Sequence, residues 1–486
     1  MYAYLAEHLP LLAALIIFAN IIIAGTVIFL ERKNPVTTLT WVMVVFFLPA
    51  IGIFLYFMLS NRVVRKRISL LTKEDEAFIR GSLQEQMKEM EDGDYKFNSK
   101  RAHFWRDMIT LNQILAKSYY TQNNDIQVIT DGQEMFDTLL EDIRNAKSTI
   151  NVIYFIIKPD EVGKRFLKVL TDKAREGVEV TVIGDGLGCR GLSRKMLAPL
   201  RRAGGSFHWF LPIKLKYLSP RLNYRNHRKL VIIDDKIGYV GGFNIGREYL
   251  GRKKKFGYWR DTQLKLTGSA VQDINARFMQ DLRVATKKDI HIKDVYFSET
   301  IDQGGIGAQI VSSGPDTSKE EIKRGFNRMV STAQERIWIQ TPYFVPSTSL
   351  QENLKVAILS GVDVRIMIPN KPDHMFVYWA TWAFVGELIE LGATVYIYDK
   401  GFMHAKTMVV DGEISTVGTA NFDRRSFRLS FETNVFIYSG KFTEKMENIF
   451  LEDMSHSYIL TKELYKERGL IIKAKESVCR LLSDLL

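Results

Sequence analysis

The chain has 486 residues, of which 46% are hydrophobic and 25% charged, a balance that excludes both a wholly disordered chain and a bundle of membrane helices. Its 67 Lys and Arg outnumber its 55 Asp and Glu, which favours an anionic partner, either nucleic acid or a negatively charged membrane surface. The two cysteines, at positions 189 and 479, exclude a disulfide scaffold and a cysteine zinc cluster and favour a reducing compartment.

Two uncharged runs, residues 9–30 and 36–59, flank the charged segment 31–35. The first run would be about 33 Å long as a helix, enough to cross a hydrocarbon core of roughly 30 Å. We therefore predict a two-span transmembrane hairpin in residues 1–60, with Pro49 kinking the second span. The alternatives are a re-entrant hairpin and a cleaved signal peptide, although the first run is long for a signal peptide and lacks a basic start.

Basic residues set the expected orientation of this hairpin. Four follow the second run (Arg62, Arg65, Lys66 and Arg67), whereas the loop between the runs offers two, Arg32 and Lys33. By the positive-inside rule the bulk of the chain faces the cytoplasm. Residues 61–124 then form a polar connector, with helices expected near 73–91 and 100–119.

From residue 125 onward the pattern is strand, helix, strand, and it occurs twice. Strands are expected at 149–157 and 178–183 around a helix at 162–176, and again at 336–340 and 362–368 around a helix at 347–360. This predicts an α/β protein with two tandem, duplicated domains, at 125–297 and 298–486. The second would end in an amphipathic helix, 470–486, that packs on the domain or contacts the membrane.

One eighteen-residue pattern is repeated at a fixed offset and tests the duplication. It contains a histidine, a lysine two positions later, four apolar residues, an aspartate and an asparagine. The first copy has His227, Lys229, Asp234 and Asn244; the second has His404, Lys406, Asp411 and Asn421, each 177 positions later. A lone His-x-Lys would most simply be an exposed strand end, but a duplicated pattern is not explained in that way.

The residue types in this pattern suit a phosphodiester. A His-x-Lys spacing directs both side chains to one face of a strand. The lysines and asparagines (Lys229, Lys406, Asn244 and Asn421) can bind nonbridging phosphate oxygens. Two imidazoles facing one phosphorus can divide the work, one as nucleophile and one as acid for the leaving oxygen. Asp234 and Asp411 are expected to orient the imidazoles or hold the lysines, and Asp261 and Glu432 are candidate supporting acids.

This constellation resembles the phospholipase D superfamily, whose members carry two His-Lys-Asp motifs. The resemblance implies a covalent phosphatidyl-histidine intermediate, with His227 as the nucleophile and His404 as the acid and then the base. It also implies that no metal ion or other cofactor is needed.

Further segments resemble bacterial cardiolipin synthases in particular. They are Glu31–Pro35, Thr341–Phe344, Asp373-His374, Gly401–Lys406 and Asn421–Ser426. The chain departs from this pattern at Leu282, where a tryptophan is expected after Asp281, a residue to which we assign no role. The family implies a multi-pass enzyme of the bacterial cell membrane that joins two phosphatidylglycerol molecules into cardiolipin and glycerol.

Three other functions share some of these features. A membrane-bound phospholipase D, or another phosphatidyl transferase, would use the same site with a different acceptor. A nuclease would use the same chemistry, but the two uncharged runs and the few stacking aromatics near the motifs argue against a nucleic-acid partner. A non-catalytic lipid-binding scaffold would not need its histidines.

Overall fold

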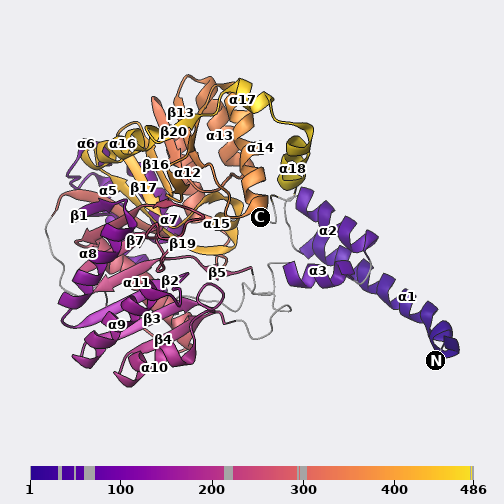
Figure 1. The fold of residues 1–486 in the computed structure, drawn as a ribbon, viewed down its shortest axis with the longest axis horizontal. Coiled ribbons are helices and arrows are strands. Elements are labelled where there is room, and N and C mark those ends of the chain that lie inside the picture. The colour runs from indigo at the N-terminus through magenta and orange to yellow at the C-terminus, as the bar shows by residue number, and fades with distance from the viewer. Residues whose placement is uncertain are drawn as a thin grey trace. The chain divides into compact units, whose positions relative to one another are not determined.

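The structure is a computed structural model that describes residues 2–30, 35–48, 51–59, 72–212, 223–292, 295, 304–481 and 483. The chain divides into two compact units (Figure 1). One comprises Met1–Ser69 with Ile213–Asn223, and the other comprises Leu70–Pro212 with Tyr224–Leu486. Both duplicated halves therefore belong to a single unit.

The first unit contains short apolar helices. They are α1 (Tyr2–Gly25), the π-helical turn η1 (Thr26–Leu30), α2 (Pro35–Phe47) and α3 (Ile51–Leu59). Trp41 of α2 and Tyr56 of α3 meet edge to face at 5.5 Å, and Gly52 lies so close to the Val44 carbonyl that a Cβ would clash. No helix among the described residues combines the length and the apolar character that a membrane crossing requires.

The second uncharged run, in which a kink at Pro49 was predicted, forms two helices, because α2 ends at Phe47 and α3 begins at Ile51. The physical reason is Pro49, which lacks an amide donor and disfavours helical geometry at the preceding residue, Leu48. The expected loop residues 31–34 and the basic residues 62–67 lie outside the described part of the chain.

The connector forms helices where they were expected. They are α5 (Lys73–Asp92), α6 (Lys100–Phe104) and α7 (Arg106–Ala116), so the second predicted helix is interrupted at Trp105. The Thr72 side chain caps α5 by accepting from the Asp75 amide, and Gly93 ends it at a positive φ of 83°.

The two halves repeat one order of elements. The first contains β1 (Thr121–Ile129), α8 (Gly132–Asn145), β2 (Thr149–Tyr154), α9 (Glu161–Arg175), β3 (Glu179–Asp185), α10 (Arg194–Arg202), β4 (Ser206–Phe210), β5 (Arg225–Asn226), β6 (Leu230–Ile233), β7 (Ile237–Gly241), β8 (Tyr258–Arg260), β9 (Gln263–Thr267) and α11 (Ala270–Thr286).

The second half contains β10 (Ile306–Ser313), α12 (Glu321–Thr332), β11 (Arg336–Gln340), β12 (Phe344–Val345), α13 (Thr348–Leu359), β13 (Asp363–Pro369), α14 (Met375–Leu391), β14 (Thr394–Tyr398), β15 (Gly401–Met403), β16 (Thr407–Val410), β17 (Ile414–Gly418), β18 (Phe422–Asp423), α15 (Arg424–Arg428), β19 (Ser430–Tyr438), α16 (Gly440–Met454), β20 (Ser457–Ile459), α17 (Lys462–Lys466) and α18 (Leu470–Leu481).

Most of these strands join one continuous sheet that runs through both halves. Its order is β20-β14-β13-β11-β16-β17-β19-β10-β1-β9-β7-β6-β2-β3-β4. The two halves meet where β1 pairs antiparallel with β10, with Thr121 opposite Ala308. Each half has a group of parallel strands, β2-β3-β4 and β11-β13-β14, and antiparallel strands toward the seam. In the second half β20 adds an antiparallel edge strand beside β14.

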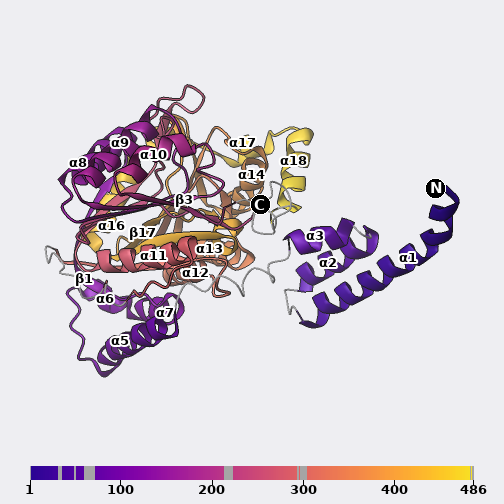
Figure 2. The same cartoon turned by 90° about the horizontal axis from the view of Figure 1, so that it is seen from below.

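Helices cover both faces of this sheet: Figure 2 shows α8, α9 and α10 on one side and α11, α12 and α13 on the other. Helix α9 illustrates why they form. Asp160 caps its first turn by accepting from the Val162 and Gly163 amides, and Val162, Phe166 and Leu170 recur at helical spacing and are buried. The predicted duplicated α/β fold is therefore confirmed, whereas the exact boundaries at 124 and 297 remain predictions.

Candidate active site

Each His-x-Lys segment crosses over to pair with the other half. Strand β5, which precedes His227, pairs in parallel with the start of β19, and the His227 amide donates to the Phe431 carbonyl at 2.9 Å. Strand β15, which precedes His404, pairs in parallel with β8, and the His404 amide donates to the Arg260 carbonyl at 2.7 Å. Both motifs therefore lie at the seam between the halves.

This crossing exchanges the supporting acids. The Nδ1 atom of His227 lies 3.0 Å from Oε2 of Glu432 and 3.1 Å from the Thr419 carbonyl oxygen. The Nδ1 atom of His404 lies 2.5 Å from Oδ2 of Asp261. Both carboxylates are completely buried. The two candidate acids are thus brought to the histidines, and each serves the histidine of the other repeat.

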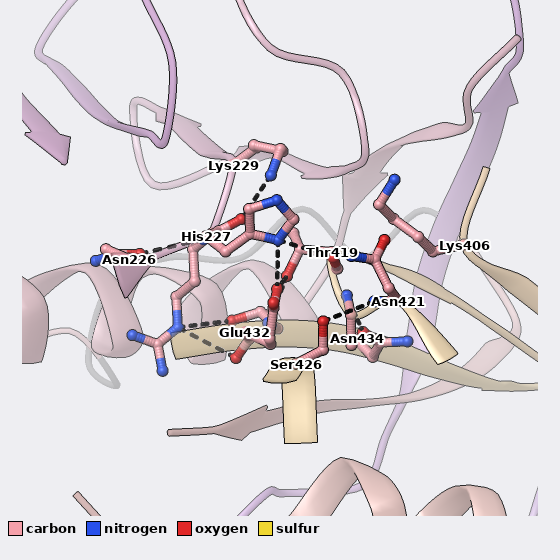
Figure 3. A network of polar contacts seen from close by, with 12 residues as sticks. Asn226, His227, Lys229, Lys406, Thr419, Asn421, Ser426, Glu432 and Asn434 are labelled. Carbon is pink, nitrogen blue, oxygen red and sulfur yellow. Dashed lines mark hydrogen bonds and ion pairs between the residues drawn. The ribbon is translucent and has the colours of Figure 1, made fainter. Parts of the chain in front are cut away.

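The contacts of His227 define its tautomer. Both partners of Nδ1, the carboxylate of Glu432 and the carbonyl of Thr419, can only accept hydrogen bonds, so Nδ1 must carry the proton and donate it. In the neutral ring Nε2 then holds a lone pair. Figure 3 shows His227 held in this way by Glu432 and Thr419.

The two motif lysines lie beside the histidines. Lys229 donates to the His227 carbonyl at 2.7 Å, and Lys406 donates to the His404 carbonyl with Nζ also 2.9 Å from the His404 Nδ1 atom. Burial lowers the pKa of Lys229 to about 7 and that of Lys406 to about 8. The charge of Lys406 also lowers the pKa of Lys229, so the two copies of the motif form one electrostatic site.

Burial also disfavours charge on both imidazoles. It lowers the pKa of His227 below its usual value and lowers that of His404 to about 4, and the neighbouring lysines add to both effects. Burial opposes ionisation of Asp261, but the charges of Lys406 and His404 outweigh it and lower the pKa of its carboxyl. These shifts favour neutral histidines beside an ionised Asp261.

The two asparagines have different surroundings. Asn244 accepts the Ile156 amide at 3.1 Å through Oδ1, which leaves its NH₂ group as a donor. The backbone amide of Asn421 donates to the Ser426 hydroxyl at 3.2 Å. The buried Oδ1 atom of its side chain has no hydrogen-bond partner among the described residues. Figure 3 shows Asn421 beside Lys406, across from His227 and Lys229.

Gly242, in the first motif, leaves room for the side chain of a neighbouring residue. A Cβ built on Gly242 would lie 1.8 Å from Oδ1 of Asp261. Glycine at this position therefore makes room for the carboxylate that holds His404. In the second half, a Cβ on Gly418 would lie 2.3 Å from Oδ1 of Asn434. Each glycine is therefore required by a neighbouring side chain.

Asp234 and Asp411 do not orient the imidazoles or hold the lysines, contrary to the expectation from sequence. Asp234 accepts hydrogen bonds from the backbone amides of Lys147, Ser148 and Thr149. The shortest distance from its carboxylate to each amide nitrogen is 2.7–3.0 Å. Asp411 accepts those of residues 334–336 at 2.8–2.9 Å. The reason is strand length, since seven residues separate each aspartate from its histidine and an extended chain rises about 3.3 Å per residue. Both aspartates anchor the far ends of their strands.

Sequence reasoning missed two buried arginine–aspartate pairs that support the motifs. Arg228, between the motif histidine and lysine, donates to both carboxylate oxygens of Asp281 at 2.7 and 2.8 Å. Arg260, immediately before Asp261, donates through Nε to both oxygens of Asp453 at 3.0 and 2.9 Å. A signal was present, because Phe-x-x-Asp occurs at 278–281 and again at 450–453, near the end of α11 and α16.

The site can thus present two imidazoles, two ammonium groups and amide donors to one phosphate. Within the described ranges no group of three or more His, Cys, Asp or Glu side chains has the arrangement of a metal site.

Two family models match this chain. The family described as "Cardiolipin synthase, PLD-like domain" matches residues 139–282 and 326–454, one segment in each half. A second family, "Phospholipase_D-nuclease N-terminal", matches residues 15–61.

Curated relatives match almost the entire chain. A cardiolipin synthase of Oceanobacillus iheyensis is 45% identical over 98% of this chain and 99% of its own length. The major cardiolipin synthase ClsA of Bacillus subtilis is 47% identical, and a cardiolipin synthase of Listeria innocua 46%, with the same coverage.

A solved structure supports the fold. The phosphatidylserine synthase of Haemophilus influenzae superposes with a TM-score of 0.60 at 18% identity, over 78% of this chain and all of that chain. The family matches, the similarity to curated relatives over nearly the full length and the duplicated motif all agree. The chain belongs to the cardiolipin synthase family of phospholipase D-like enzymes.

Proposed function

We propose that this phosphatidyltransferase joins two phosphatidylglycerol molecules into cardiolipin and releases glycerol through a phosphatidyl-histidine intermediate. The observation that carries the proposal is the exchanged pairing of His227 with Glu432 and of His404 with Asp261. It fixes both imidazoles through Nδ1 and leaves both Nε2 atoms for a nucleophile and a general acid. The relatives' name, cardiolipin synthase, supports the product.

In the first step, Nε2 of His227 attacks the phosphorus of one lipid, and the bond from phosphorus to the glycerol headgroup oxygen breaks. His404, protonated at Nε2, gives its proton to that oxygen, and glycerol leaves. The pKa of His404 is about 4 in the protein alone, and an anionic phosphate beside the ring raises it. The nonbridging oxygens are bound by Lys229, Lys406, Asn244 and Asn421.

In the second step, His404 removes a proton from a headgroup hydroxyl of the second phosphatidylglycerol. The hydroxyl oxygen attacks the phosphorus, the bond to His227 breaks, and cardiolipin is released. One phosphodiester replaces another, so the exchange needs no nucleotide. A lipid hydroxyl held at the bilayer surface is favoured over water as the attacking group, because it is held close to the phosphorus.

We further propose that residues 1–60 hold the enzyme in the bacterial cell membrane as a multi-pass hairpin, with the catalytic part on the cytoplasmic side. The uncharged runs, the family match over residues 15–61 and the basic residues at 62–67 support this placement. Labelling cysteines introduced at positions 33 and 65 from either side of intact cells tests it; equal access from one side would contradict two crossings.

The reaction is tested with purified enzyme and phosphatidylglycerol as the sole lipid. Cardiolipin and glycerol in equal amounts support the synthase, whereas phosphatidic acid and glycerol would identify a hydrolase instead. The His227→Ala variant should form neither product; if it kept the activity of the wild type, a non-catalytic role for the motif would replace this proposal.

A further inference from the structure

The last described helix, α18 (Leu470–Leu481), packs along α14 through one face. Its buried side chains are Glu476 and Cys479. Lys475 lies over the Trp379 ring at 5.5 Å, and Arg480 lies over the Phe384 ring at 5.5 Å. These two contacts place α18 against the middle of α14.

The opposite face of α18 is apolar and exposed. Leu470 is 84% exposed, Ile471 74%, Val478 54% and Leu481 84%. At about 100° per residue they lie in one sector, together with exposed Ala474, directly opposite the buried face. A helix that only packs on its own domain would carry polar residues there, so this face requires an apolar environment.

Cations line both edges of this apolar stripe. Lys473 lies along one edge and Lys475 along the other, and both are exposed, whereas Arg480 pairs with Glu387 of α14. The one acidic residue of the helix, Glu476, is turned inward, where Arg468 pairs with it at 2.8 Å. An apolar stripe with basic edges is the pattern of helices that lie in the headgroup layer of a membrane, and the cations are complementary to anionic lipid.

The stripe is connected to the active site through α14. Asp373, just before this helix, accepts the Tyr343 hydroxyl, and its charge acts on the pKa of Lys406. Met375 and Phe376, at the same end of α14, are 52% and 60% exposed.

We propose that α18 is an interfacial docking helix that inserts its apolar stripe into the headgroup layer of an anionic bilayer. It holds the catalytic unit against the surface from which substrate is drawn, in addition to any anchoring by residues 1–60. This docking does not depend on the reaction that the site performs.

A fluorescent label on the full-length protein in vesicles tests the surface directly. Val478→Cys and, as the control, Ile114→Cys carry the label; the two native positions are 54% and 55% exposed, and both native cysteines are buried. The vesicles contain phosphatidylglycerol with phosphatidylcholine, or phosphatidylcholine alone. We expect the label at 478, and not at 114, to shift to the blue and to be quenched by lipids spin-labelled near the headgroup, more strongly in the anionic vesicles.

Two results would overturn the proposal. A label at 478 that is shielded but is not quenched by spin-labelled lipid would mean that protein covers the stripe, either residues 1–60 or a second copy. A label as water-exposed as that at 114 would mean that nothing covers it.

A kinetic comparison adds a second readout and rests on the proposed function. Val478→Glu should raise KM for vesicle phosphatidylglycerol roughly ten-fold, with kcat/KM for a dispersed short-chain lipid unchanged. Ile114→Glu should change neither value. Equal effects of the two variants on vesicles would contradict docking through α18, whereas inactivity of every variant and of the wild type would contradict the proposed function and leave the fluorescence result intact.

Discussion

The Nδ1 atom of His404 lies 2.5 Å from the Oδ2 atom of Asp261, although the two residues belong to different repeats and are 143 positions apart. The mirror relationship joins His227 to Glu432 across 205 positions. A carboxylate in this position fixes the imidazole and stabilises its positive charge when it accepts a proton. The histidine of each repeat is therefore held by an acid of the other repeat.

Replacing Asp261 by Asn tests this dependence. The amide keeps the shape of the side chain but loses the charge that stabilises protonated His404, so kcat should fall by about 10²–10⁴. The rate of cardiolipin formation measures the effect. Asp235→Asn is a matched control in the same half, since Asp235 binds the Asn275 amide group away from the histidines, and it should keep the wild-type kcat. Wild-type turnover in Asp261→Asn would mean that the pair is only structural.

The roles of the two histidines can be separated with a lipid that carries a good leaving group, such as p-nitrophenol. Such a substrate needs no general acid in the first step, so His404→Ala should release a burst of nitrophenol and accumulate the phosphatidyl-enzyme, because the base for the second step is missing. His227→Ala should give neither. Mass spectrometry of the intact protein measures the adduct. An adduct in His227→Ala and none in His404→Ala would reverse the assignment.

The lysines should set the alkaline limb of the pH profile. Lys229 and Lys406 bind phosphate only when protonated, and with pKa values of about 7 and about 8 they lose that charge as pH rises. We expect kcat/KM to fall above about pH 7, whereas kcat should hold to higher pH, because bound phosphate raises both pKa values. The acid limb should lie below the usual histidine pKa, since burial lowers that of His227. Coincident alkaline limbs for kcat and kcat/KM would contradict this explanation.

We expect the buried arginine–aspartate pairs to contribute more to the stability of the fold than to the reaction rate. Asp281→Ala leaves the guanidinium of Arg228 buried without its partner, which costs about 3–5 kcal/mol of unfolding free energy in such pairs. Thermal unfolding of the purified protein measures the loss. A compensating pair, Asp281→Leu with Arg228→Met, should recover much of the stability; if it were no more stable than Asp281→Ala, an uncompensated charge would not be the cause.

For the motif aspartates we expect the opposite effect from that of the active-site acids, namely a loss of stability with little change in kcat. Asp411→Ala leaves the amides of residues 334–336 without their acceptor and should lower stability by about 1–3 kcal/mol, with little change in kcat for the folded enzyme. Asp411→Asn should cost less, because asparagine accepts one of these bonds and tolerates the φ of 53° at this position. A large loss of kcat with unchanged melting temperature would restore a catalytic role.

The sequence was informative where chemistry and periodicity coincide. The constant offset of 177 positions predicted two α/β halves and placed His227, Lys229, His404 and Lys406 in one site. Adjacency within the motif was misleading for Asp234, because a strand carries it to the opposite end of β6 from the site. Which acid serves which histidine could not be predicted, since it depends on the pairing of β5 with β19 and of β8 with β15, contacts that leave no local pattern.

The exchange of acids has a consequence for the way such a protein can be divided. A chain cut between the repeats would yield two fragments, each with a histidine and a lysine but without the carboxylate that its own histidine uses. Neither fragment could be active alone, and mixing them would restore turnover only at concentrations that allow them to associate. Linking both repeats covalently makes assembly of the site independent of protein concentration.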